Sequence, residues 1–402
     1  MEDNKLANFF EQYLTQKSIF VNKDALQPQF QPEPILHRDQ EEERVAAVIA
    51  PILKNQKPNN LFVYGNTGTG KTLVVSHVIG KVRHIAKQHQ IPAFIAYINC
   101  NLKRTADTEY RFITQVLKEI GRSIPYTGLP TDQVYNIFYE EVEKKKCQMI
   151  LVLDEIDTLV EKTDDQLLYN LLRINEHLHE SRVSIIGISN VVNFIETLEP
   201  RVKSSLSTET IMFPRYNAVQ ILDILRQRTA LAFQDGVIEN GVLEKCAALL
   251  GQENGDVRRA IALLRTAAEI CEREKQQTVT LSHLEKAEES MESTAVIDFV
   301  KVQPRQHHAT LCAILTACGQ RQHPVFTGEI YEHYQEICRK ASLRPLTQRR
   351  VSDIIQEFDM VGLITSKVIS KGRYGRTREI HLALPASTVA QVHEMVTTGL
   401  NG

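Results

Sequence analysis

The first half of the chain alternates between short apolar runs and longer segments in which apolar positions have a helical spacing. The apolar runs predict buried strands at 60–65, 93–99, 148–157 and 183–190. Apolar residues at three- and four-residue steps predict helices at 37–55, 71–88, 105–120, 132–146 and 165–178. Because strands alternate with helices of this length, the predicted fold class is α/β, a parallel sheet covered by helices on both faces.

The pattern changes after residue 217. Segment 217–290 has an almost wholly helical pattern, and three further helices are predicted at 305–319, 326–341 and 347–360. Two strand-like runs follow, at 362–370 and 376–384. Three helices followed by a hairpin predict a winged helix, a variant of the helix-turn-helix whose second helix enters the major groove of DNA.

These patterns predict three parts. The first is a base at 1–215, which includes a polar N-terminal arm at 1–33 with no assigned role. The second is a helical lid at 216–297, and the third is a winged-helix domain at 298–402.

The overall composition of the chain limits the classes of protein to which it can belong. The chain has 402 residues, 43% of them apolar, and a net charge of −2, which argues against a protein that coats nucleic acid along its whole length. Positive charge is nevertheless concentrated locally, since 340–380 holds nine Lys and Arg against four Asp and Glu. The seven cysteines include no C-x-x-C pair and are expected to be reduced thiols. The sequence has neither an apolar stretch of membrane-spanning length nor a signal-peptide pattern, so a cytoplasmic protein without a membrane partner is expected.

The segment "GNTGTGKT" at 65–72 matches the phosphate-binding pattern G-x-x-x-x-G-K-[ST] between a predicted strand and a predicted helix. Its glycines let backbone amides converge on phosphate oxygens without Cβ clashes, and the following helix adds its positive end. Lys71 is expected to reach the β- and γ-phosphates of ATP or ADP, and the Thr72 hydroxyl to hold Mg²⁺. The predicted nucleotide-binding residues of this loop are Gly65, Asn66, Thr67, Gly68, Thr69, Gly70, Lys71 and Thr72.

Polar residues end two of the other predicted strands. "ILVLDEID" at 150–157 ends in Asp154 and Glu155, and acids at the carboxyl end of a parallel strand point into the ligand crevice. Asp154 is expected to hold Mg²⁺ together with Thr72, and Glu155 to polarise the attacking water. Asn190, after the next strand, is expected to orient that water and to sense the γ-phosphate, although asparagine also ends many strands as a turn residue.

The order of phosphate loop, acidic strand and polar-ended strand resembles that of the AAA+ ATPases. "LEPRVKSSL" at 198–206 looks like the segment that carries their arginine finger, which implies that Arg201 reaches a nucleotide on a neighbouring subunit. "GDVRRA" at 255–260 is similar to the start of the sensor-2 helix, which implies that Arg258 reaches the γ-phosphate in cis. The resemblance further implies that four residues line the nucleotide pocket: His37, Arg38, Tyr216 and Arg228.

The predicted winged helix supplies the candidate DNA contacts. Thr347 is placed as the N-cap of a helix whose apolar face is formed by Val351, Ile354, Ile355 and Phe358. Polar and basic side chains cover its other faces, and the hairpin tip that follows is basic and aromatic. The candidate DNA-binding residues are Gln348, Arg349, Arg350 and Ser352 on the helix, and Lys371, Arg373, Tyr374 and Arg376 on the hairpin.

The stretches "RRVSDII", "DMVGLI" and "KGRYGRTREI" resemble the archaeal origin-recognition initiators, relatives of the eukaryotic origin recognition complex and its helicase-loading partner. The resemblance runs from about residue 33 to 395. It implies binding of double-stranded origin DNA, association with other initiator subunits or paralogues, loading of the replicative helicase, and a nucleoid-associated location in the cytoplasm. It also implies that ATP acts as a switch with slow hydrolysis, and that an insertion at 101–130, with Lys103, Arg104, Arg111 and Arg122, touches DNA.

Two other classes of function stay open at this point. A clamp-loader-like or remodelling ATPase that acts on proteins would use the winged helix as an interaction module and would not bind duplex DNA. An ATP-dependent transcription regulator would carry the same modules but bind promoters. The sequence of the hairpin favours the initiator, because that stretch is specific to the initiator family.

Overall fold

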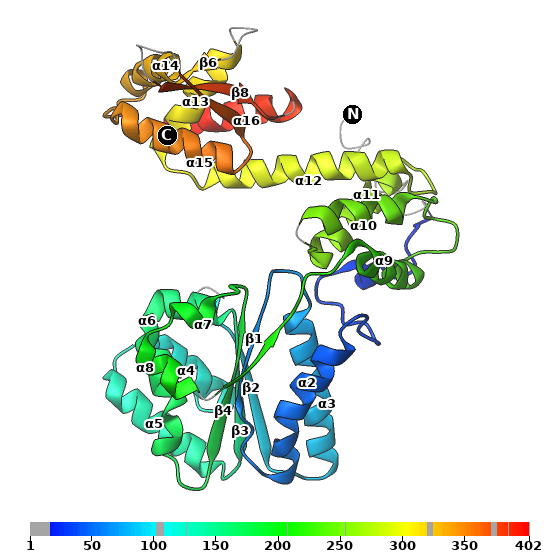
Figure 1. Cartoon of the computed structure of the whole chain (residues 1–402), viewed down its shortest axis with the longest axis vertical. Coiled ribbons are helices and arrows are strands. Elements are labelled where there is room, and N and C mark those ends of the chain that lie inside the picture. The colour runs from blue at the N-terminus through cyan, green and yellow to red at the C-terminus, as the bar shows by residue number, and fades with distance from the viewer. Residues whose placement is uncertain are drawn as a thin grey trace, which may run out of the picture. The chain divides into compact units, whose positions relative to one another are not determined.

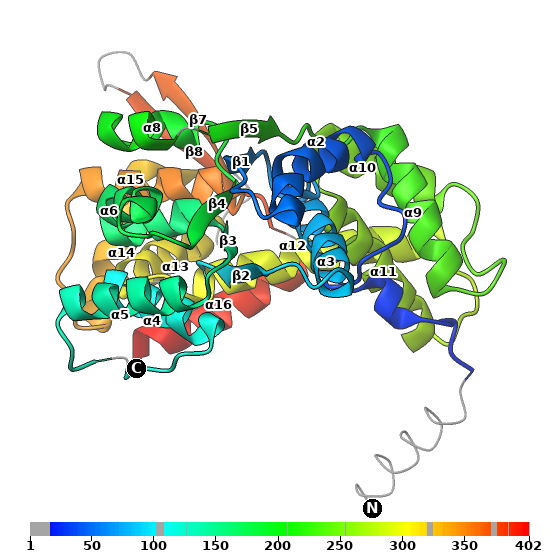
Figure 2. The same ribbon diagram turned by 90° about the horizontal axis from the view of Figure 1, so that it is seen from below.

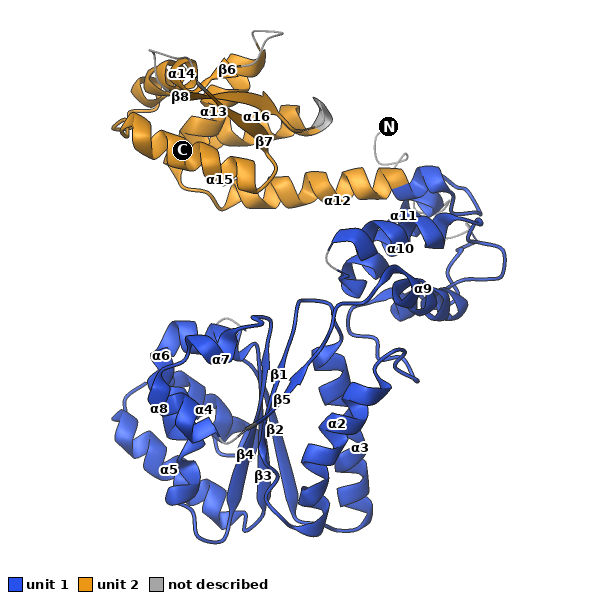
Figure 3. Cartoon of the chain, viewed as in Figure 1, with its two compact units in different colours: residues 1–284 blue, residues 285–402 orange. Residues whose placement is uncertain are grey.

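The computed structural model describes residues 17–101, 108–125, 127–206, 208–253, 255–319, 325–370, 376–384 and 386–401. The chain forms two compact units, Met1–Leu284 and Glu285–Gly402, and Figure 3 colours them separately. The division falls inside one long helix, α12 (Leu281–Lys301). The predicted base and the predicted lid as far as Leu284 belong to the first unit, whereas 285–297 belong to the second, and the boundaries at 215 and 297 remain predictions.

The first unit contains a five-stranded sheet in the order β2-β3-β4-β1-β5. All of its strand pairs are parallel, which confirms the predicted α/β class. The strands are β1 (Asn60–Tyr64), β2 (Ala93–Asn99), β3 (Gln148–Asp154), β4 (Arg182–Ser189) and β5 (Thr208–Met212). β5 was not among the predicted strands, because its short "TETIM" at the edge of the sheet has three polar residues followed by only two apolar ones and shows no strand pattern of its own.

Helices cover both faces of this sheet, as Figure 1 shows. α2 (Asp39–Ile49) and α3 (Lys71–Gln88) pack on one face, where Val45, Val74 and Val78 are buried against Val63 and Val152. The other face carries α4 (Glu109–Ile120), α5 (Thr131–Lys144), α6 (Ile156–Leu172), α7 (Phe194–Thr197) and α8 (Pro200–Leu206). Short 3₁₀ turns complete this part: η2 (Ala50–Lys54) and η3 (Ile174–Glu176).

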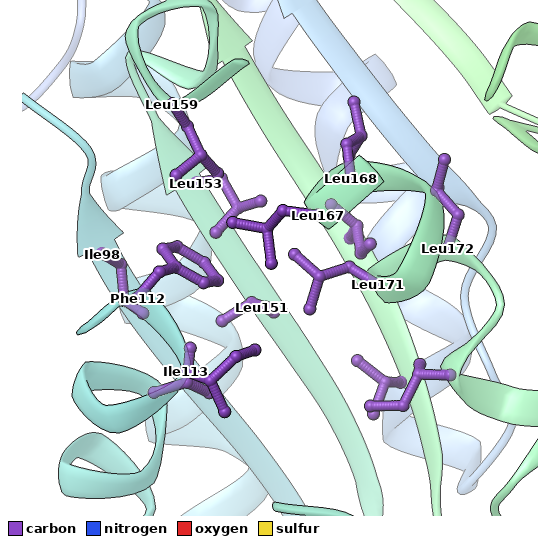
Figure 4. Packing of buried hydrophobic residues seen from close by; sticks show 14 of the residues in the cluster. Ile98, Phe112, Ile113, Leu151, Leu153, Leu159, Leu167, Leu168, Leu171 and Leu172 are labelled. Atoms are coloured by element: carbon purple, nitrogen blue, oxygen red, sulfur yellow. The ribbon is translucent and has the colours of Figure 1, made fainter. Parts of the chain in front are cut away.

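An apolar core lies on each face of the sheet, and the core on the face covered by α4–α6 is the larger of the two. Figure 4 shows side chains of α4 and α6 pointing toward those of β3, with Phe112 beside Ile98 and the leucines of α6 opposite Leu151 and Leu153. Leu168 of α6 is completely buried there. A buried leucine of this kind contributes about 2–5 kcal/mol to folding.

The rest of the first unit is helical. The turn η1 (Lys23–Leu26) precedes the sheet in sequence, and α9 (Ala218–Ala232), α10 (Val242–Glu253) and α11 (Val257–Arg273) form the lid, seen from a second direction in Figure 2. α9 begins with a capping box, in which Asn217 and Gln220 exchange side-chain to backbone hydrogen bonds. The Asp256 side chain caps α11 by accepting from the backbone amides of Arg258 and Arg259.

The second unit has its own core and the predicted winged-helix order. Its helices are α13 (Arg305–Gly319), α14 (Thr327–Lys340) and α15 (Gln348–Met360), and its three-stranded sheet has the order β6-β8-β7. β7 (Ile364–Ser370) and β8 (Arg376–Leu382) are antiparallel, as a hairpin requires. The sequence pattern missed β6 (Val325–Phe326) and the C-terminal helix α16 (Ala386–Asn401), whose Val392 and Val396 are buried in this core. Within the ranges given above, no helix has the length and apolar character needed to cross a membrane.

Replacing Leu168 with alanine should lower the free energy of unfolding of the first unit by about 2–5 kcal/mol, because it removes a buried side chain and leaves a cavity. The matched control is Leu231→Ala on α9, since Leu231 is 44% exposed and should cost well under half as much. Denaturant unfolding of both variants provides the comparison. Equal losses would mean that the α4–α6 core is not what stabilises the sheet.

Candidate nucleotide site and DNA-binding face

The predicted phosphate loop connects β1 to α3, and its backbone has the shape that the glycines allow. Gly68 and Gly70 have φ values of 74° and 90°, a region that residues with a Cβ rarely adopt. Gly70 is followed directly by the first turn of α3, so the amides of that turn face the loop. The side-chain amide of Asn66 faces the guanidinium of Arg215. The loop is thus a ready anion site at a helix N-terminus.

Lys71 lies within this loop. Its ammonium donates hydrogen bonds to the carbonyls of Gly65 and Asn66, at 2.7 Å each. Burial, followed by the positive charge of Arg258, lowers the pKa of Lys71 to about 8. The positive charge of Lys71 therefore lies on the loop itself, where it would meet the phosphate oxygens of a ligand.

Gly68 brings the loop into contact with the lid. A Cβ built on Gly68 would lie 1.8 Å from Oδ1 of Asp256, the N-cap of α11. Only a glycine permits this approach. The start of α11, which carries Arg258, is therefore held directly against the phosphate loop.

Thr72 and Asp154 form the predicted metal pair. The Thr72 hydroxyl lies 3.2 and 3.3 Å from the two carboxylate oxygens of Asp154, which is 5% exposed. Burial raises the pKa of Asp154, against the lowering effect of hydrogen bonds from Tyr97 and Thr72. A hydroxyl and a buried carboxylate are oxygen ligands of the kind that Mg²⁺ prefers, so these residues fit the ion.

Glu155 and Asn190 lie at the same end of the sheet. Glu155 is the N-cap of α6 and has left-handed backbone angles, φ 56° and ψ 48°, which cost energy for a residue with a side chain. Strain of this kind is concentrated at functional sites. Asn190 follows β4, and its backbone amide donates to Asp157 at 3.3 Å. Both Glu155 and Asn190 line the pocket beside the phosphate loop.

That pocket has a volume of about 650 Å³ and brings most of the predicted site together. Its base wall includes Lys71, Thr72 and Asp154, and its lid wall includes Tyr216, Arg228 and Arg258. The predicted residues found among its lining residues are Gly68, Thr69, Gly70, Lys71, Thr72, Asp154, Glu155, Asn190, Tyr216, Arg228 and Arg258.

Most of a third wall of the pocket was missed by the sequence pattern, since the resemblance placed only the segment "ILHR" at 35–38 near the nucleotide. This wall is formed by residues 26–36, from Leu26 through the proline-rich stretch to Leu36. Arg228 holds this segment by donating to the carbonyls of Ala25 and Phe30, at 3.1 and 3.2 Å, with its guanidinium 4.8 Å from the centre of the Phe30 ring. Burial lowers the pKa of Arg228 to about 10. Further bonds run from Gln227 to the carbonyl of Pro34 and from Arg265 to the side chain of Gln27.

The signal for this wall was weak, because prolines at 28, 32 and 34 break any regular periodicity. The burial of Arg228 in the middle of α9, which requires that another segment cover it, is seen only in the structure. The described part of the arm, from residue 17 onward, therefore packs on the lid helices.

The first three residues of the predicted loop, Gly65, Asn66 and Thr67, are not among the described residues that line the pocket. Three further predicted residues lie outside the loop and outside the pocket lining. His37 is 3.0 Å from Asp223 of α9. Arg38 is buried with its guanidinium 3.8 Å from the centre of the Tyr216 ring, and it donates to the carbonyl of Thr69 at 2.9 Å, so it supports the phosphate loop from behind. Arg201 is half exposed, pairs with Glu199 at 2.5 Å and lies over the ring of Tyr169. None of the three is among the described residues that line the pocket, and their predicted roles remain predictions.

The second unit carries the candidate DNA-binding face on α15. Thr347 caps this helix, as expected, by accepting from the amide of Arg350. Gln348, Arg349 and Arg350 are exposed, whereas Ser352 is partly covered. Arg350 pairs with Asp353 at 3.7 Å.

Arg378 of β8, which the sequence pattern did not single out, links the hairpin to α15. It donates to the side chain of Gln356 at 3.0 Å and lies 3.4 Å from the Ser366 hydroxyl. Ser366 in turn donates to Asp359 at the end of α15. The hairpin base and the helix are therefore fixed to each other.

Several candidate DNA contacts lie outside the described residues: Lys103, Arg104, Lys371, Arg373 and Tyr374. Arg376 begins β8, but its side chain is also outside what the structure describes. Arg111 belongs to α4, and Arg122 follows that helix.

Comparison with known proteins places these modules in one family. Family models match in chain order: "AAA domain" at 54–193, "Cdc6 AAA+ ATPase-type lid domain" at 222–289 and "CDC6, C terminal winged helix domain" at 298–392. An ORC1-type DNA replication protein of Thermococcus onnurineus is 43% identical over 98% of this chain and 95% of its own length. The chain belongs to the ORC1-type DNA replication proteins. The counterpart in Pyrococcus furiosus is 44% identical over 96% of this chain and 93% of its own length.

Solved structures agree with this assignment. The Aeropyrum pernix ORC1 protein, solved in complex with DNA, is 38% identical, with a TM-score of 0.80 over 94% of this chain and 97% of the other. The ORC2 protein of the same organism, solved with ADPNP and ADP, is 19% identical with a TM-score of 0.60 over 96% of this chain and all of the other, and shares the fold. The resemblance to the archaeal initiators and the predicted architecture of AAA+ base, lid and winged helix are confirmed.

Replacing Gly68 with alanine should weaken ATP binding by about tenfold or more, since a left-handed backbone with a Cβ costs roughly 1–2 kcal/mol before the clash with Asp256 is counted. The control is Gly80→Ala in α3, where a Cβ meets nothing within 4 Å and the helix should be unchanged or slightly more stable. Titration with a fluorescent ATP analogue measures both. Equal affinities for the two variants would contradict the loop–lid contact.

Proposed function

We propose that this chain is an ATP-regulated replication initiator that binds double-stranded origin DNA and helps load the replicative helicase. The observation that carries the proposal is the combination, in an ORC1-type chain, of a phosphate loop closed by a lid and a winged helix whose α15 exposes Arg349 and Arg350 at its start. The ORC1 protein of Aeropyrum pernix was solved in complex with DNA, which supports the same function. The relatives' family name supports a place in replication rather than transcription.

The nucleotide would be held by the loop and the ends of the strands. Loop amides and Lys71 would bind the phosphates, and Thr72 and Asp154 would hold Mg²⁺, which neutralises phosphate charge when bound. Glu155 would polarise the attacking water, and Asn190 would orient it. Tyr216 and Arg258 would contact the nucleotide from the lid side, so binding would fix the lid to the base.

Hydrolysis would be completed by a neighbour. Arg201 lies on α8, half exposed, and is held by Glu199 and the ring of Tyr169. A guanidinium presented in this way stays charged and can bind phosphate bidentately on another subunit. Isolated chains would therefore hydrolyse ATP slowly, and ATP would act as an assembly switch.

DNA would be bound by α15 and the hairpin. Exposed Arg349 and Gln348 at the start of α15 are suited to base edges in the major groove, and the basic hairpin tip is suited to phosphates. The excess of positive charge at 340–380 explains how a mildly acidic chain would bind DNA locally. We place such a protein in the cytoplasm, associated with the nucleoid.

Glu155→Gln should retain ATP binding but stop turnover, because only the water-polarising carboxylate is lost. Lys71→Ala should instead weaken ATP binding itself, since the loop loses its cation. Equilibrium binding and phosphate release, each measured on both variants, separate the two roles. Wild-type turnover in Glu155→Gln would remove Glu155 as the base, and unchanged affinity in Lys71→Ala would count against the whole site.

Arg349→Ala should weaken binding to the origin duplex by about 1–3 kcal/mol and weaken binding to a scrambled duplex less, because a base contact is lost. The control is Arg273→Ala at the end of α11, which removes the same charge from a side chain that is 77% exposed on the lid. Affinity for both duplexes is measured at several salt concentrations. If wild type and both variants share one affinity and one salt slope, α15 is not the DNA reader, and a protein-interaction role takes its place.

A further inference from the structure

A tyrosine on β2 contacts the carboxylate of the predicted metal pair. The Tyr97 hydroxyl donates to Oδ2 of Asp154 at 2.5 Å, which is a short hydrogen bond. Tyr97 is partly buried, and Asp154 is almost completely buried. No family motif quoted above includes Tyr97, and it is not among the described residues that line the pocket.

The register of the sheet explains why this tyrosine reaches this carboxylate. β2 and β3 pair in parallel, with Asn99 opposite Asp154 and Tyr97 opposite Val152. Tyr97 therefore lies two residues before the level at which β3 ends with Asp154. Its long side chain spans that distance toward the carboxyl edge of the sheet. The ring packs against the apolar cluster under α3, so the hydroxyl is carried on a well-supported side chain.

The contact fixes one side of the Asp154 carboxylate. Thr72 approaches from α3, the backbone amide of Glu155 donates to Oδ1 at 3.1 Å, and Tyr97 approaches from β2. A carboxylate has about four lone-pair positions, so three donors from fixed directions leave room for a cation while limiting rotation of the group. The amide of Cys100 also donates to the carbonyl of Asp154 at 2.8 Å and holds the backbone.

We propose that Tyr97 is a positioning residue for the metal-binding carboxylate, and that its hydroxyl sets the Mg²⁺ affinity of the chain when nucleotide is bound. The inference rests on the proposed nucleotide function of the site. Groups that orient metal ligands typically change metal affinity by about 10–100-fold when removed. Tyr97 does not touch the nucleotide pocket itself, so it acts through Asp154.

The test is Tyr97→Phe in the full chain, because phenylalanine keeps the ring and its packing and removes only the hydroxyl. The matched control is Tyr110→Phe on α4, whose hydroxyl donates to the carbonyl of Pro125 at 2.8 Å. The affinity for a non-hydrolysable ATP analogue is measured once with Mg²⁺ and once with a chelator. The ratio of the two affinities is the gain that the metal provides, and the thermal midpoint is followed in parallel.

We expect Tyr97→Phe to bind the analogue as wild type does in chelator, and to lose about tenfold of the Mg²⁺-dependent gain. Tyr110→Phe should keep the wild-type gain. An unchanged gain in Tyr97→Phe overturns the role of Tyr97 alone, and so does a parallel loss of affinity in both conditions, which indicates a structural role. If wild type itself shows no gain with Mg²⁺, the proposed metal site fails, and the inference about Tyr97 fails with it.

Discussion

Thr72 and Asp154 meet across two strands, and this contact depends on the parallel register of the sheet. Asp154 ends β3 opposite Ile188, and Tyr64 ends β1 opposite Ser189, so β1, β4 and β3 end at one level. α3 then starts from the loop after β1 and brings the Thr72 hydroxyl to within 3.2 Å of the carboxylate. A slip of one residue in any of these pairings would turn the acidic strand end to the opposite face. The buried apolar strands that fix the register therefore also fix the site.

The sequence predicted the elements that have a strong period and the motifs that those elements carry. Four of the five parallel strands and the capped helix α15 were predictable, because long apolar runs and a threonine cap have local signals. β5 was not, since a short edge strand is defined by its neighbour β1 rather than by its own pattern. α16 was missed for the same reason, because its valines can be recognised as core residues only when the rest of the core of the second unit is known.

The candidate site shows the same division. The phosphate loop and the acids after β3 follow from chemistry that is local in sequence, and the pocket contains them. The wall at residues 26–36 could not be predicted in this way. It is held by hydrogen bonds between segments about two hundred residues apart, such as those from Arg228 to the carbonyls of Ala25 and Phe30. Arg38 illustrates the converse. The sequence assigned Arg38 to the site, and Arg38 does lie close to it in space. Its guanidinium, however, lies against the ring of Tyr216 and donates to the carbonyls of Thr69 and Pro214.

These contacts connect the nucleotide site to the lid by three independent routes. Asp256 lies against Gly68, Arg38 holds Tyr216 beside Gly70, and Arg228 holds the arm that covers the pocket. Each route joins a group on the lid side to the loop or to the arm, and a ligand that fills the pocket would contact one member of each route, namely Gly68, Tyr216 and Arg228. A nucleotide would therefore change the stability of the lid position more than that of the sheet, whose core is complete without it. This is the physical property that a nucleotide switch needs, because a ligand shifts an equilibrium only by the difference in its contacts with the two states.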